Sequence, residues 1–129
     1  MVNMYYIIET GKSFEQASKD LESAVKNNSF GVLCVHDLRA TLLVKGVELG
    51  EDCKIFEICN PKQASKVLIT DMRLNMALPC RISVFTDKGK MIGFIKPVQM
   101  LSALSSNKEL LKVAEEVEES AIRMIDEAK

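Results

Sequence analysis

The chain is poor in the features that mark nucleic-acid binding, export or membrane insertion. It has no Trp, aromatic residues make up 5% of its 129 residues, and 17 basic residues face 18 acidic ones. A duplex-DNA-binding domain normally carries a clear basic excess, so we expect no nucleic-acid partner. The amino-terminal residues lack the basic start and long apolar stretch of a signal peptide, and no apolar run approaches the ~18 residues of a membrane span. We therefore expect a cytoplasmic protein that has no membrane partner.

What is present is the composition of an ordinary globular protein. Apolar residues make up 47% of the sequence and charged residues 27%, which is close to the average for folded domains. The length is typical of one domain and too short for two. These proportions predict a single domain over residues 1–129 that has a proper hydrophobic core.

The cysteines do not have the spacing of the common metal and redox motifs. There are four: Cys34, Cys53, Cys59 and Cys80. No two are separated by the two-residue gap of zinc-binding or thioredoxin-type motifs, so we assign no metal ligands. Cys34 and Cys53 lie inside predicted strands and are interpreted as core residues. The single histidine, His36, is interpreted as a strand-end pair with Asp37, and a base for a thiol is its alternative role.

Hydrophobic periodicity predicts strands that alternate with helices. The strands are expected at 2–9, 30–37, 53–59, 81–86 and 91–96, and the helices at 14–28, 38–45, 60–70 and 98–104. A capping box at Ser106 and Glu109 is expected to open the longest helix, which runs to about Asp126. The last two strands form a hairpin, and there is no Gly-rich phosphate loop, which argues against a Rossmann fold. We predict an α+β fold: a mostly antiparallel sheet of about five strands, helices on one face, and a long C-terminal helix.

The most informative position is Cys59, because it precedes a predicted helix start. Asn60 is a good N-cap and Pro61 suits the first helical position. Unpaired amides and the helix dipole favour negative charge there, so Cys59 is a candidate for a reactive thiol, and a buried strand-end cysteine is the alternative. If the third and fourth strands pair antiparallel, Cys80 at the start of the fourth strand becomes a neighbour of Cys59.

The ordered set Cys-Asn-Pro at 59–61 and Leu-Pro-Cys at 78–80 resembles the domain of unknown function 302 family. The resemblance extends over most of the chain, from the first strand to Pro97. It implies a compact α+β fold grouped with TATA-binding-protein-like folds, a homodimer, and no established activity, although some members resemble components found with sulfur metabolism. It also points to a site of four residues: Cys59, Asn60, Pro61 and Cys80.

Three functions remain open at this point. The first, which we favour, is a dimeric module that binds a small ligand in an apolar cleft beside Cys59 and Cys80. The second is a thiol protein that handles a disulfide, a persulfide or a soft metal at those two cysteines. The third has no chemistry and uses the long helix as a dimer surface through Leu110, Val117 and Met124. The sequence identifies no cofactor and no catalytic residue, and it does not decide whether the protein is an enzyme.

Overall fold

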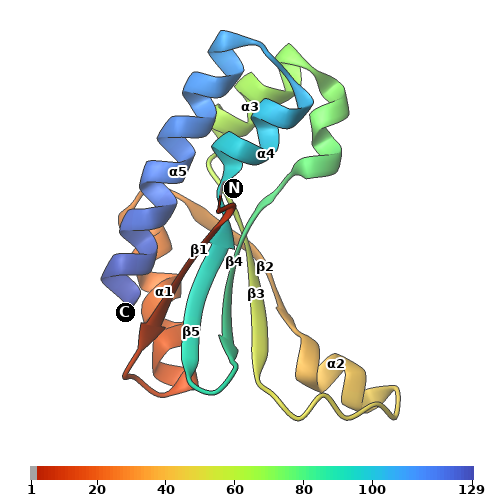
Figure 1. Cartoon of the computed structure of the whole chain (residues 1–129), viewed down its shortest axis with the longest axis vertical. Coiled ribbons are helices and arrows are strands. Elements are labelled where there is room, and N and C mark those ends of the chain that lie inside the picture. The colour runs from red at the N-terminus through yellow and green to blue at the C-terminus, as the bar shows by residue number, and fades with distance from the viewer. Residues whose placement is uncertain (1–2) are drawn as a thin grey trace.

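The computed structural model describes residues 3–129 and has the predicted α+β fold. Within these residues, five strands form one antiparallel sheet in the order β1-β5-β4-β3-β2 (Figure 1). The strands are β1 (Tyr5–Thr10), β2 (Gly31–Asp37), β3 (Cys53–Cys59), β4 (Cys80–Thr86) and β5 (Lys90–Ile95). The helices are α1 (Phe14–Asn27), α2 (Leu38–Val44), α3 (Pro61–Thr70), the 3₁₀ helix η1 (Met72–Ala77), α4 (Pro97–Leu104) and α5 (Lys108–Ala128).

The helix starts show which local signals decided the fold. Ser13 and Asn60 cap α1 and α3 as predicted. The Ser13 hydroxyl accepts a hydrogen bond from the backbone amide of Gln16 at 3.1 Å. The side-chain oxygen of Asn60, Oδ1, accepts one from the backbone amide of Gln63 at 3.2 Å. The predicted start of α5 was wrong. Asn107, not Ser106, is its N-cap and accepts from the Leu110 amide at 3.1 Å, because Asn is as good a cap as Ser and lies one residue nearer the apolar stripe.

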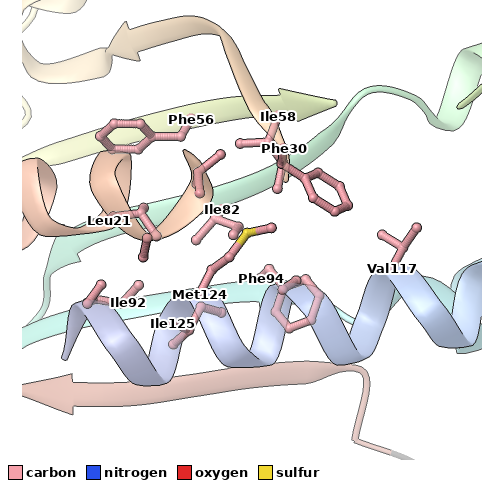
Figure 2. Close-up of a cluster of buried hydrophobic side chains, with 14 of the residues drawn as sticks. Leu21, Phe30, Phe56, Ile58, Ile82, Ile92, Phe94, Val117, Met124 and Ile125 are labelled. Carbon is pink, nitrogen blue, oxygen red and sulfur yellow. The ribbon is translucent and has the colours of Figure 1, made fainter. Parts of the chain in front are cut away.

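The core lies between the sheet and two helices. Helix α5 packs against α1 along one face of the sheet, and Figure 2 shows their side chains meeting those of the strands. Leu21 of α1, Ile82 of β4 and Met124 of α5 have no exposed surface. Leu110 and Val117 are also buried, so the stripe that the third function requires as a dimer surface is covered within the chain.

The other face of the sheet is open. Tyr5, Ile7 and Ile95 lie on it and are 58%, 47% and 49% exposed. Helix α2 leaves the sheet at the end opposite α3 and α4 and has no buried residue (Figure 1). In the described part of the chain, none of the helices combines the length and apolar character that crossing a membrane requires.

Candidate functional site

At one end of the sheet, strands β4 and β5 separate, and a cavity lies between them. Strand β4 pairs with β5 only as far as Ser83, opposite Gly93. Beyond this point β4 continues along β3 to Cys80, and β5 continues along β1 to Ile95. Between the two diverging strands is a cavity of about 460 Å³, which reaches from Ile95 on the open face to Val117 on α5. This volume is in the range of small-molecule binding sites.

A second cavity of about 280 Å³ adjoins the first. It lies between α3 and the ends of β3 and β4, and the two cavities share a wall that includes Ile58, Leu78 and Pro79. Among the described residues, Arg81 is the only charged side chain that lines either space. The two cavities therefore form a mostly apolar region between the sheet, η1, α3 and α5.

Three of the four predicted site residues lie in the wall of the second cavity. Ile58 is directly opposite Cys80 in the β3–β4 pairing, so Cys59, the next residue, lies diagonally across from Cys80. Asn60 also lines the cavity, whereas Pro61 does not and serves as the first residue of α3. The antiparallel pairing of β3 and β4 thus brings residues 59 and 80 onto neighbouring positions.

The environment of Cys80 keeps its thiol protonated. Burial, together with the electrostatic effect of nearby Cys59, raises the pKa of Cys80 to about 11. Reactivity requires the thiolate, so Cys80 is a weak nucleophile at neutral pH. It is a better apolar wall residue than an attacking group.

One polar group in the second cavity has an unused hydrogen-bonding capacity. The side-chain nitrogen of Gln63, Nε2, donates a hydrogen bond to the Glu116 carboxylate at 3.3 Å. Its carbonyl oxygen, Oε1, is buried and has no hydrogen-bond partner in the described structure. The side-chain oxygen of Asn60 already accepts the hydrogen bond that caps α3. Gln63, which the sequence analysis did not single out, is therefore the acceptor that a ligand can use, and its position three residues after the N-cap was the available signal.

Two cysteines and the histidine do not lie where the sequence analysis placed them. Cys34 is exposed and Cys53 only partly buried, so neither is a core residue. Burial and the nearby Asp37 carboxylate raise the pKa of Cys53. His36 pairs with Glu57, Nε2 to Oε1 at 2.9 Å, and not with Asp37, which caps α2. For Cys34 and His36 the reason is a bulge in edge strand β2, which turns both side chains to the open face.

Taken together, the fold and cavities define a small α+β protein whose antiparallel sheet is covered on one face and opens beside two thiols. The chain belongs to the family described as "Domain of unknown function DUF302", which matches residues 6–128. It is also similar to a solved structure, an uncharacterized conserved DUF302 protein from Bacillus stearothermophilus. The two are 25% identical, with a TM-score of 0.92 over 99% of this chain and 100% of the other. No curated protein matches the sequence.

Proposed function

We propose that this protein binds a small, mostly apolar ligand in the two adjoining cavities, with Cys59 and Cys80 in the wall. The observation that carries the proposal is the divergence of β4 from β5, which leaves about 460 Å³ among apolar side chains. A compact core normally closes such a space because unfilled volume loses dispersion contacts. A ligand that fills it restores those contacts.

The polar groups around the cavities define the expected chemistry of the ligand. Gln63 Oε1 accepts a hydrogen bond from a hydroxyl or amide of the ligand. Arg81 lines the first cavity and is exposed, so it suits a negative or polar end that remains near solvent. The ligand is therefore an apolar body with one donor group and at most one anionic end.

The test combines native mass spectrometry with cavity-filling variants. Mass spectrometry of the purified protein detects a ligand that co-purifies. Titration with the anionic dye anilinonaphthalene sulfonate then compares wild type with Ala77→Phe, which fills the first cavity, and Ala64→Phe, which fills the second. Ala103→Phe on the exposed surface of α4 is the control.

We expect at least one of the two filling variants to weaken dye binding about tenfold or more, because the added phenyl ring takes up space that the dye needs. The control should bind like wild type. A clean apo mass, together with equal dye binding by all variants, would show that the cavities take no ligand.

We also propose that the protein is a homodimer, because α2 is uncovered in the single chain. Isolated helices shorter than about 12 residues are marginal in water, yet seven-residue α2 has no buried residue. The segment that it opens exposes four large apolar residues: Leu43, Val44, Val47 and Leu49. A second copy packed on this segment would bury them.

Sedimentation velocity tests the dimer. Val44 and Ile69 are similarly exposed, at 88% and 82%. They belong to α2 and α3, which lie at opposite ends of the molecule (Figure 1). We expect Val44→Lys to be monomeric at concentrations where wild type and Ile69→Lys are dimeric. A monomeric wild type, or a Val44→Lys variant that remains dimeric, would contradict the proposed surface.

A thiol function is the second candidate, supported by the neighbouring positions of Cys59 and Cys80. In this function the two thiols give up two electrons and two protons to an oxidant and form one disulfide. Mild oxidation with diamide should then lower the intact mass by two hydrogens in wild type and Cys53→Ser, but not in Cys59→Ser. A mass that does not change in wild type would leave both cysteines as wall residues.

A further inference from the structure

A second group of chemistry-bearing side chains lies on the open face of the sheet, apart from the cavities. One ligand atom each from Cys34, His36 and Glu57 lies within 4.8 Å of the other two. Cys34 and His36 come from edge strand β2, and Glu57 comes from β3. Cys34 lies directly opposite Glu57 in the pairing, and His36 lies two residues further along the same face.

A β-bulge creates this arrangement. Val32 is opposite Ile58, so regular pairing would place Leu33 opposite Glu57 and turn Cys34 and His36 to the covered face. The register instead shifts between Val32 and Cys34, which places Cys34 opposite Glu57. Bulges commonly re-aim side chains at sheet edges. Here the bulge brings a thiol, an imidazole and a carboxylate to one side of the sheet.

The three donors match the preferences of one class of metal ion. Thiolate, imidazole and carboxylate are the ligands of Zn²⁺, and three protein ligands leave a fourth tetrahedral position for water or another molecule. Ligand atoms around tetrahedral zinc are about 3.5 Å apart, given its usual bond lengths. His36 Nε2 and Glu57 Oε1 are already 2.9 Å apart, so small side-chain rotations would bring all three donors into range.

The surroundings of Glu57 leave one of its oxygens for a metal. Oε1 faces His36, while Oε2 lies 3.6 Å from the Arg81 guanidinium. Arg81 therefore contacts the carboxylate through the oxygen that does not face His36. A thiolate and a carboxylate together neutralise a divalent ion, so the loaded site carries no net charge apart from Arg81.

We propose that Cys34, His36 and Glu57 form a three-ligand site for a divalent ion of the zinc class, with a fourth position open to solvent. The ion joins edge strand β2 to β3 beside the bulge. Metal binding to such ligands displaces protons, so affinity falls as the pH is lowered. Because the ion binds only the folded arrangement, it also raises the melting temperature.

Cobalt titration of the reduced protein under anaerobic conditions tests the site directly. Co²⁺ replaces Zn²⁺ and gives a thiolate-to-metal charge-transfer band in the near ultraviolet. The ligand variants are Cys34→Ser, His36→Gln and Glu57→Gln. The matched controls remove a thiol elsewhere: Cys53→Ser on the same face, and Cys59→Ser at the cavity.

We expect one ion per chain in wild type and in both controls. Cys34→Ser should lose the band, and the other two ligand variants should weaken binding by more than the roughly 10- to 100-fold that second-shell changes cost. Circular dichroism of each variant without metal establishes that it is folded. The proposal fails if the band survives in Cys34→Ser, if it disappears in Cys59→Ser, if half an ion binds per chain, or if wild type gives no band.

Discussion

The two faces of the sheet are made by the same strands but offer opposite environments to their side chains. On the covered face, Ile82 is fully buried and Cys80 has a pKa of about 11. On the open face, Ile95 is half exposed, and Cys34 lies in solvent beside His36 and Glu57. A cysteine on the covered face is thus a neutral wall group, whereas one on the open face is available to a cation. The environment, and not the residue type, separates the two roles.

The largest expected effect compares one isoleucine from each face. Ile82→Ala should lower the free energy of unfolding by about 2–5 kcal/mol, because it leaves a cavity where Ile82 is fully buried. Ile95→Ala on the open face should cost less than about 1 kcal/mol, because its side chain is already 49% exposed. Urea unfolding followed by circular dichroism measures both. Equal losses would show that the open face is covered in solution, as a dimer through that face requires.

The second effect compares thiols. At pH 8 the raised pKa of Cys80 leaves it roughly 100-fold less thiolate than an ordinary cysteine, so its alkylation in the folded protein should be slower by at least that factor. The measurement is mass spectrometry of iodoacetamide-labelled peptides, native and in urea. Exposed Cys34 serves as the internal control and should differ little between the two conditions. Equal rates of Cys80 alkylation in the native protein and in urea would show that burial does not keep its thiol protonated.

Most of the fold could be predicted because its signals are local. The caps at Ser13 and Asn60, the apolar stripe of α5 and the hairpin before β5 each depend on residues close in sequence. The N-cap of α5 was missed by one residue, because Ser106 and Asn107 are both good caps, and its C-terminal end was missed by two. The connection before β4, for which no helix was predicted, contains the 3₁₀ helix η1, because helices of this kind are too short to give a clear hydrophobic period.

Only the part of the candidate site that depends on strand pairing could be predicted from the sequence. The sequence made the proximity of residues 59 and 80 conditional on antiparallel pairing of β3 and β4, and these strands do pair in that way. The cavity was not predictable in detail, because it depends on where the β4–β5 pairing stops. The cluster at Cys34 was missed because a bulge has no clear sequence signature, and one extra residue exchanges the two faces of a strand.

The third effect concerns the helix that covers one face. Asn107→Ala should lower the free energy of unfolding by about 0.5–2 kcal/mol, since it removes the acceptor of the Leu110 amide at the start of α5. Ser106→Ala, one residue earlier, should change it by less than about 0.5 kcal/mol. Thermal unfolding of both variants decides between the two caps. A larger loss for Ser106→Ala would restore the start predicted from the sequence.

The smallest effect uses two adjacent tyrosines that point to opposite faces. Tyr6 packs edge-on against Phe94, and its hydroxyl donates to the Asp126 carboxylate of α5 at 2.7 Å. Tyr6→Phe removes this link between edge strand β1 and α5 and should cost up to about 1 kcal/mol. Tyr5→Phe on the open face is the matched control, since Tyr5 is 58% exposed, and it should leave stability unchanged.

The pH dependence of the Tyr6 link gives an independent check. The hydrogen bond to Asp126 raises the pKa of Tyr6 in the folded protein above its ordinary value of 10.0. A group whose folded pKa is raised adds stability below its unfolded pKa, and that stability is lost as the pH rises through the folded pKa. The stability difference between wild type and Tyr6→Phe should therefore be constant up to about pH 9 and shrink above pH 10. A difference that persists at high pH would contradict the hydrogen bond from the protonated Tyr6 hydroxyl to Asp126 as its source.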